Sequence, residues 1–183
     1  MNLGNRNELD GEDMKIKVDV ITLHAVQNYG SVLQALATQK LLERHGCEVR
    51  IINYIRENVK YENLLETRSN GNFLKKIILY PNIKRWKKVF EGFCNEYLNL
   101  TEKSYTTDQE FEEYPLEADI FCTGSDQVWN SKWNLGIILP LYLSFVPADR
   151  FKLLWLLVLD KRNCHKKKLK PHKNILMSII LFQ

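Results

Sequence analysis

Apolar and β-branched residues run almost without interruption from Lys15 to Leu23, and a short polar turn follows them. Strands that are covered on both faces of a parallel sheet have this pattern, so the run predicts a buried strand. In open α/β sheets, ligands bind outside the carboxyl ends of the strands, next to helix N-termini. The turn at residues 27–31, with the sequence QNYGS, is therefore the first candidate for a binding loop.

Helical spacing takes over after this turn, and predicts a helix with Ser31 as its N-cap and Gly46 at its C′ position. The apolar stripe consists of Val32, Leu33, Leu36, Ala37, Leu41 and Leu42, while Gln39, Lys40, Glu43 and Arg44 are expected to face solvent. Residues 47–55 then form a second predicted strand. A strand, a helix and a strand in this order make a βαβ unit, whose two strands lie parallel through a right-handed crossover.

The rest of the chain predicts further elements of both kinds. They are a polar loop at 56–72, a short helix at 73–80 that Pro81 ends, a longer helix at 83–97 with Trp86, Val89, Phe90 and Phe93 on one face, a helical turn at 108–113, a third strand at 118–123 and a further strand at 142–145. Together these elements indicate an α/β fold, a Rossmann-like parallel sheet with flanking helices.

A second polar turn follows the third predicted strand, and the two turns are expected to meet in one crevice at the carboxyl edge of the sheet. The candidate binding residues are Asn28, Tyr29, Gly30 and Ser31 in the first turn, and Gly124, Ser125, Asp126, Gln127 and Trp129 in the second. Carboxylate and amide groups bind sugar hydroxyls, and an indole covers a ring face. Each group also has a structural interpretation, since Asn28 can shape its turn, and Ser125 and Asp126 suit an N-cap and a first helical turn.

His24, at the end of the first strand, is the candidate general acid or base; the alternative is a core histidine with satisfied hydrogen bonds. The sequence has no Ser-His-Asp order, no Gly-x-Gly-x-x-Gly fingerprint and no metal-ligand spacing. Its four cysteines are far apart in the chain and are interpreted as buried, inert thiols. Hydrolase, dinucleotide-binding and metalloenzyme functions therefore lack support, and no metal site is expected.

The composition describes an ordinary globular domain, with 45% apolar and 26% charged residues in 183. The longest apolar run, Leu153 to Leu159, is too short to cross a bilayer, and the polar, acidic start does not suit a signal peptide. A cytoplasmic location is the expectation. Basic and aromatic residues alternate between Lys75 and Lys88, but a solvated helix face explains them without nucleic acid, which is not expected as a partner.

Two segments together resemble the polysaccharide pyruvyl transferase family of bacteria. They are residues 22–35, TLHAVQNYGSVLQA, and residues 119–130, DIFCTGSDQVWN, and the likeness covers about residues 14–150. The resemblance implies a Rossmann-like fold, with this chain similar to the N-terminal domain of a GT-B-like two-domain transferase. It also implies transfer of a pyruvyl group from phosphoenolpyruvate, the donor substrate, to a sugar of a cell-surface polysaccharide precursor, without a further cofactor.

In such a transferase the Arg and His groups that hold the donor belong to the second domain, for which this chain shows no counterpart. The resemblance therefore implies a truncated form with weak or no activity. The alternative from another functional class is a non-catalytic module that binds a nucleotide sugar or an acidic partner in the Asn28 and Ser125 loops.

The sequence divides into a disordered extension at 1–13, the Rossmann-like domain at 14–150 and an atypical apolar and Lys-rich tail at 151–183. The tail carries eight Lys/Arg against Asp160 alone. Because the composition changes abruptly there, we hypothesise a shift of the reading frame near residue 152, which sequencing the gene would test. The alternative is a genuine basic tail, in which the cluster from Lys161 to Lys173 contacts an acidic membrane surface or nucleic acid.

Overall fold

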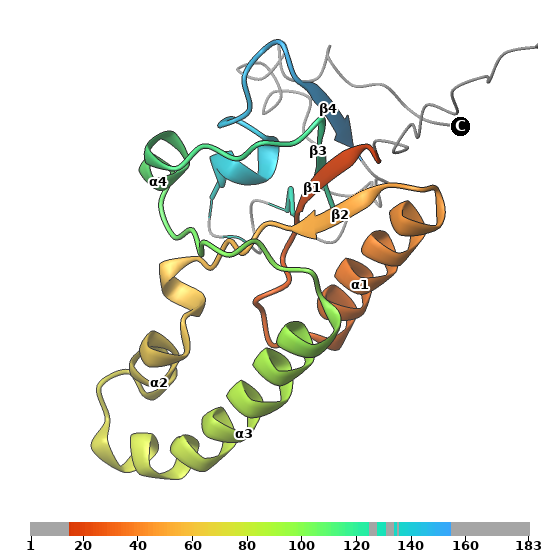
Figure 1. Ribbon diagram of the computed structural model, residues 1–183. Coiled ribbons are helices and arrows are strands. Elements are labelled where there is room, and N and C mark those ends of the chain that lie inside the picture. Colours follow the sequence, from red (N-terminus) through yellow and green to blue (C-terminus); the bar gives the residue numbers. More distant parts are fainter. Residues whose placement is uncertain (1–14, 125–127, 131–133, 135, 155–183) are drawn as a thin grey trace, which may run out of the picture.

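The computed structural model describes residues 15–124, 128–130, 134 and 136–154. Within them lies one sheet of four strands, all parallel, in the order β2-β1-β3-β4 (Figure 1). The strands are β1 (Lys17–Ile21), β2 (Glu48–Ile51), β3 (Ile120–Thr123) and β4 (Phe151–Leu154). The predicted α/β class, with a Rossmann-like parallel sheet and flanking helices, is confirmed. The sheet also takes in the first four residues of the segment that the sequence divided off at residue 151.

Four α-helices and two 3₁₀ helices accompany the sheet in the described part of the chain. They are α1 (Tyr29–Arg44), η1 (Glu57–Val59), α2 (Tyr61–Ser69), α3 (Phe73–Tyr97), α4 (Gln109–Glu113) and η2 (Leu139–Tyr142). None of the helices among these residues is long and apolar enough to span a bilayer.

The predicted N-cap of α1 was wrong, because Asn28 rather than Ser31 caps this helix. Asn28 has an extended backbone, and its Oδ1 accepts hydrogen bonds from the N–H groups of Gly30 at 2.8 Å and Ser31 at 3.4 Å. Ser31 lies inside the first turn and is buried. At the other end the prediction is confirmed, since Gly46 follows the C-cap His45 with a φ of +85°, a conformation that glycine adopts without strain.

The buried stripe of α1 also differs from the predicted one. Gln39 is fully buried, whereas Leu33 is exposed. The amide of Gln39 can be buried because backbone groups satisfy it: Oε1 accepts from the N–H of Asn99 at 2.8 Å, and Nε2 donates to the carbonyl of Tyr97 at 3.4 Å. Apolar residues occur on two sides of this helix, so hydrophobicity alone did not identify the side that packs.

Three further predictions of local structure were wrong. The polar segment 56–72 contains α2, and α3 continues through Pro81 instead of ending there. The α2 helix contacts α3 on both sides of this proline, because Glu66 pairs with Lys76, and Tyr61 Oη donates to the carbonyl of Trp86 at 3.3 Å. The predicted strand at 142–145 is replaced by η2 and a turn in which Leu143 has a φ of +57°.

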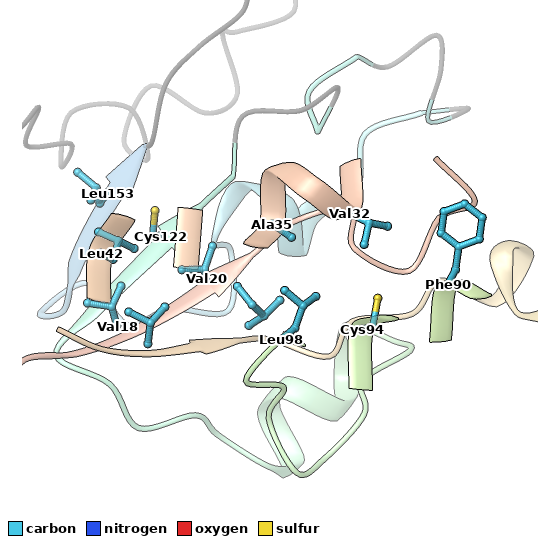
Figure 2. Packing of buried hydrophobic residues seen from close by; sticks show 12 residues of the cluster. Val18, Val20, Val32, Ala35, Leu42, Phe90, Cys94, Leu98, Cys122 and Leu153 are labelled. Carbon is cyan, nitrogen blue, oxygen red and sulfur yellow. The ribbon is translucent and has the colours of Figure 1, made fainter. Parts of the chain in front are cut away.

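Two apolar clusters lie on opposite faces of the sheet. On one face, Val18 and Val20 of β1 pack with α1 and with the C-terminal half of α3, as Figure 2 shows. On the other face, Ile21 and Phe121 pack with α4, η2 and the loops around them. Alternation along β1 therefore sends successive side chains into different cores.

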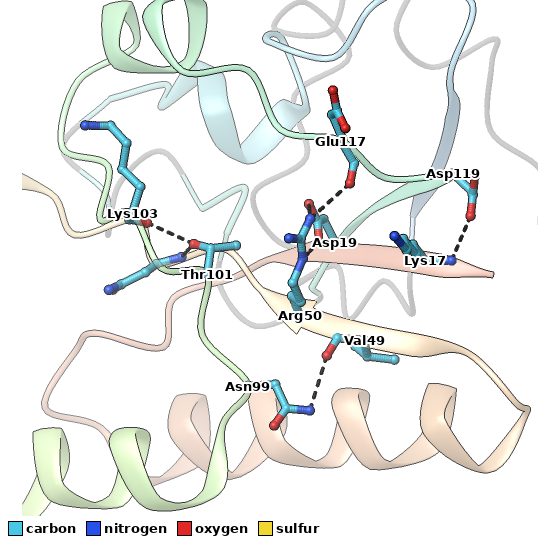
Figure 3. Close-up of polar contacts among 10 residues, drawn as sticks. Lys17, Asp19, Val49, Arg50, Asn99, Thr101, Lys103, Glu117 and Asp119 are labelled. Carbon is cyan, nitrogen blue, oxygen red and sulfur yellow. Dashed lines mark hydrogen bonds and ion pairs between the residues drawn. The ribbon is translucent and has the colours of Figure 1, made fainter. Parts of the chain in front are cut away.

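The second face also buries a charge, Asp19, in the middle of β1. Arg50 lies opposite it on β2, and both oxygens of the carboxylate accept from the guanidinium, at 2.8 and 2.9 Å (Figure 3). Arg50 also donates to the carbonyl of Glu117 at 3.0 Å. Burial raises the pKa of the Asp19 carboxyl, and the guanidinium opposes this shift. The bidentate ion pair links β2 to β1, and the bond to Glu117 links Arg50 to the segment that precedes β3.

Candidate functional site

The carboxyl ends of β1 and β3 lie side by side. Ile21 is the register partner of Thr123, and the N–H of Gly124 donates to the carbonyl of Ile21 at 2.8 Å. The chain passes from β1 to β2 on one side of β1 and places β3 on its other side, so the strand order reverses here. Ligands of doubly wound sheets bind at such a switch point. Both candidate turns begin at this edge.

Gly124 has no room for a side chain at this junction. A Cβ atom on Gly124 would lie 2.5 Å from Oγ1 of Thr22 and 2.7 Å from its Cβ. The Thr22 hydroxyl is buried and has no hydrogen-bond partner among the residues that the structure describes. The glycine therefore permits the close approach of the two strand ends, which is its structural role whatever the loop binds.

The residues of the first turn are held by the start of α1. Both Oδ1 contacts of Asn28 are helix-capping bonds, as described above, so its carbonyl oxygen shapes the turn. The ring of Tyr29 is 68% exposed and rests against Phe90 of α3, with 4.9 Å between the ring centroids. Gly30 gives its N–H to the cap, and Ser31 is buried. Of these four residues, Tyr29 offers the largest accessible side chain.

In the second turn, Trp129 is described and makes two contacts within the protein. Its Nε1 donates to the carbonyl of Leu141 at 3.3 Å, and its ring stacks on Tyr142 at a centroid distance of 5.8 Å. These contacts orient the indole and occupy its N–H group. Ser125, Asp126 and Gln127 lie outside the described residues.

His24 is almost completely buried at the end of β1, with 2% of its surface exposed. Its Nδ1 lies 3.4 Å from the carbonyl oxygen of Thr22, and its Nε2 lies 3.3 Å from Oδ1 of Asn53. Burial lowers the pKa of the imidazole, which favours the neutral ring at pH 7. A neutral imidazole has one unprotonated nitrogen, through which it can act as a base, whereas its remaining N–H is a very weak acid.

A cavity of about 200 Å³ lies beside His24, between the ends of β1 and β2 and the helices α2 and α3. Its polar lining includes His24 and Asn53 from the strand exits, Lys60 and Tyr61 at the start of α2, and Glu91 of α3; Phe90 adds an aromatic wall. Of the residues predicted from sequence, His24 alone lines it. The other polar residues of the lining were not predicted. Lys60 and Tyr61 lie in the segment 56–72, which was predicted to be a loop, and Asn53 was placed inside a strand.

The groups around the cavity are poor nucleophiles at neutral pH. Burial raises the pKa of the Cys94 thiol to about 11 and that of the Tyr61 hydroxyl to about 12, so both keep their protons. The thiol of Cys94 donates weakly to the carbonyl of His24, with a Sγ–O distance of 3.7 Å. Within the described ranges there is no cluster of side chains suited to a metal ion. The described lining thus combines neutral polar groups with two charged residues, Lys60 and Glu91.

Three cations near this edge have partners: Lys60, Arg56 and Arg68, the last of which donates to Oε1 of Gln27 in the first turn at 2.9 Å. The ammonium of Lys60 pairs with Glu57 at 2.7 Å. Arg56, which the sequence analysis did not single out, is half-buried and donates to Oδ1 of Asn134 at 3.2 Å. Its partner is a neutral amide, so the guanidinium charge is not cancelled by a carboxylate in the part of the chain that is described. Arg56 connects the exit of β2 with the loop that follows β3.

Residues 28–157 match the family model described as polysaccharide pyruvyl transferase. The match begins at the cap of α1, includes both candidate turns and extends through β4; His24 lies before it. No significant match was found among the curated proteins or the solved structures.

Proposed function

The chain belongs to the polysaccharide pyruvyl transferase family, and from this membership we propose that it binds the sugar acceptor in the transfer of a pyruvyl group. The proposed donor is phosphoenolpyruvate, and the proposed acceptor is a sugar of a cell-surface polysaccharide precursor, used in the cytoplasm of a bacterium. The adjacency of the β1 and β3 exits supports this proposal most directly, because it brings both turns of the matched segment to one edge of the sheet.

The proposed reaction turns phosphoenolpyruvate and two sugar hydroxyls into a cyclic ketal and inorganic phosphate. Each hydroxyl oxygen forms a bond to the central carbon of the enolpyruvyl group, and the bond from that carbon to the phosphate oxygen breaks. One hydroxyl proton ends on the methylene carbon, which becomes a methyl group, and the other leaves with the phosphate. A base near the attacking hydroxyl and an acid near the methylene carbon are therefore required.

His24 suits the base in this reaction better than the acid, since burial keeps its ring neutral. We propose that a sugar placed over the strand exits meets His24 through the cavity and contacts Tyr29 from the first turn. The residues Asn28, Gly30, Ser31, Gly124 and Trp129 shape the walls of this site, and Ser125, Asp126 and Gln127 are proposed to contribute polar contacts to the sugar.

The donor requires more positive charge than the described residues offer at this edge. Phosphoenolpyruvate carries a phosphate and a carboxylate, which proteins bind with several cations. Lys60 is engaged with Glu57. The cations at this edge with neutral partners are Arg56, bonded to Asn134, and Arg68, bonded to Gln27 and stacked on Trp86. We therefore propose that a second domain supplies the donor site, and that the 183-residue chain alone transfers pyruvyl groups weakly or not at all.

An assay of phosphate release tests the proposal that the donor site lies in a second domain. The chain is incubated with phosphoenolpyruvate and with a panel of hexoses and nucleotide-linked hexoses, and inorganic phosphate is measured over time. We expect no release above the rate of the denatured chain. Robust, acceptor-dependent release would show that one domain suffices, and would overturn the proposal that the donor site lies elsewhere.

Calorimetry separates acceptor binding from the alternative of a passive nucleotide-binding or anion-binding module. We expect a methyl hexoside to bind, and we expect neither uridine diphosphate nor phosphoenolpyruvate to compete with it, because the described lining offers no unpaired cation: Lys60 is paired with Glu57, and Glu91 is an acid. Binding of uridine diphosphate without any binding of the hexosides would favour the passive module instead.

A further inference from the structure

The N-terminal half of α3 exposes large apolar side chains that belong to neither apolar cluster of the described structure. The exposed fractions are 73% for Phe73, 69% for Leu74, 55% for Ile77, 75% for Ile78 and 54% for Tyr80. Successive helical residues are about 100° apart, so these five fall within an arc of about 160°. Ile83 and Phe90, which are buried, lie on the opposite side of the helix. The first turns of α3 are therefore apolar on their packed side and also on their free side.

Basic residues continue the same face along the next two turns. Lys84, Arg85 and Lys88 are exposed and project within the same arc. From residue 73 to residue 88 there are six Lys/Arg and no Asp/Glu, and of these cations Lys76 pairs with Glu66 and Lys87 with Glu91. The sequence of this stretch predicts a solvated lysine face, whereas in the structure Lys84, Arg85 and Lys88 border an exposed apolar surface.

The position of this surface leaves it accessible. Figure 1 shows that α2 and the N-terminal half of α3 extend away from the sheet, with the Phe73 end farthest from the strands. Arg68 fixes this pair of helices to each other and to the first turn, since its guanidinium lies 4.6 Å from the Trp86 ring centroid and donates to Oε1 of Gln27 at 2.9 Å. The surface thus lies at the end of a hairpin whose two helices are in contact.

We propose that residues 73–88 of α3 dock on an anionic membrane surface, with the apolar side chains of the first turns in the interface and Lys84, Arg85 and Lys88 at the lipid phosphates. Helices that lie in the plane of a membrane combine these two features. The charge favours lipid over a second copy of the same surface: residues 73–88 contain no carboxylate that could pair with these cations, whereas anionic headgroups complement them. Surface docking needs no spanning helix, in keeping with the absence of one among the described residues.

Co-sedimentation of the full chain with vesicles tests this proposal. We compare vesicles of phosphatidylcholine alone with vesicles of phosphatidylcholine and phosphatidylglycerol at three to one. We expect binding to the anionic vesicles that weakens as salt is raised, because screening weakens the electrostatic part. The paired change Leu74→Gln and Ile78→Gln is expected to lower the partition coefficient at least about tenfold, and Lys84→Gln with Lys88→Gln about thirtyfold.

Matched variants elsewhere on the surface control for composition. Ile137→Gln removes an exposed apolar side chain in a loop, and Lys15→Gln with Lys17→Gln removes two exposed charges at the other edge of the sheet; both are expected to leave binding unchanged. Circular dichroism confirms that each variant is folded. Vesicle binding that is equal in all variants would overturn the proposal, and would favour the Lys161–Lys173 cluster as the contact.

Two other outcomes would also overturn it. One is the absence of any binding to anionic vesicles by the full chain. The other is a dimer in solution that Leu74→Gln with Ile78→Gln converts to a monomer, which would make the apolar surface an interface between two copies. Neither outcome bears on sugar binding at the strand exits, so failure here is distinguishable from failure of the proposed function.

Discussion

His24 shows how one buried side chain couples function to stability. Burial lowers the pKa of its imidazole below the usual 6.5, so below that pH the unfolded chain binds a proton that the folded chain does not. The free energy of unfolding should therefore fall as pH drops below 6.5, by up to about 1.4 kcal/mol per pH unit until the folded-state pKa is reached.

Urea denaturation at several pH values between 5 and 8 measures this dependence. His24→Gln should reduce the acid sensitivity, because the variant has no imidazole to protonate at this position. His45→Gln, at the exposed C-cap of α1, serves as the matched control and should retain the wild-type dependence. The assignment fails if both variants retain the full slope.

At the residue scale, the sequence predicted where a polar side chain such as Asn28 lies better than it predicted what that side chain does. Asn28 was correctly assigned to a turn before a helix, and its side chain proved to be the cap. Its capping bonds depend on a backbone conformation that the residue type alone does not fix. Asn53 and Arg56 were missed because their neighbours, α2 and the loop around Asn134, are brought to them only by the fold.

The contact between the β1 and β3 exits can be tested at the scale of elements through Gly124. A methyl group there would lie within 3 Å of Thr22, so Gly124→Ala must push the two strand ends apart. We expect this variant to lose about 1–3 kcal/mol of unfolding free energy. Gly92→Ala is the matched control: Gly92 lies in α3 with open space around it, and the change should add up to about 1 kcal/mol.

Thermal and urea unfolding of the two glycine variants give the comparison. Both variants add the same methyl group, so a fall in the free energy of unfolding for Gly124→Ala and a rise for Gly92→Ala would be the diagnostic result. If Gly124→Ala proved as stable as the wild type, the two exits could not be as close as described.

Pro81 offers a second test at this scale. It lies inside α3 on the exposed side, where its ring excludes one hydrogen bond of the helix. Pro81→Ala should restore that bond and raise the unfolding free energy by about 1–3 kcal/mol. Asn82→Ala, at the exposed neighbouring position, should add at most about 0.7 kcal/mol. A loss of stability in Pro81→Ala would contradict a continuous α3.

The elements that sequence predicted well are those whose pattern and packing agree. β1 and β3 are buried on both faces, so their apolar runs directly reflect their surroundings, and β2 alternates between buried Val49 and Ile51 and the more exposed Glu48 and Arg50. The helices at the edge of the molecule were predicted less well. The α2 segment is polar and becomes helical against α3, and the two halves of α3 are held together across Pro81 by contacts with α2, which no local pattern reveals.

At the scale of the whole molecule, the two surfaces for which functions are proposed lie apart. The carboxyl edge of the sheet carries the matched turns and the cavity beside His24. The tip of the α2–α3 hairpin carries the apolar and basic residues proposed to meet a membrane. The arrangement would hold a sugar site at a fixed distance from a lipid surface, because the Arg68 contacts join the hairpin to the first turn.

The central claim is that a sugar binds where β1 and β3 end, and amide chemical shifts measure this most directly. A ¹⁵N-labelled chain is titrated with the methyl hexoside that binds best by calorimetry. The account predicts saturable shifts at the backbone amides of Tyr29, Gly30 and Gly124 and in the ring resonances of His24, with amides at the opposite edge, such as Lys17 and Glu48, unaffected. Shifts confined to residues away from the β1 and β3 exits would contradict it.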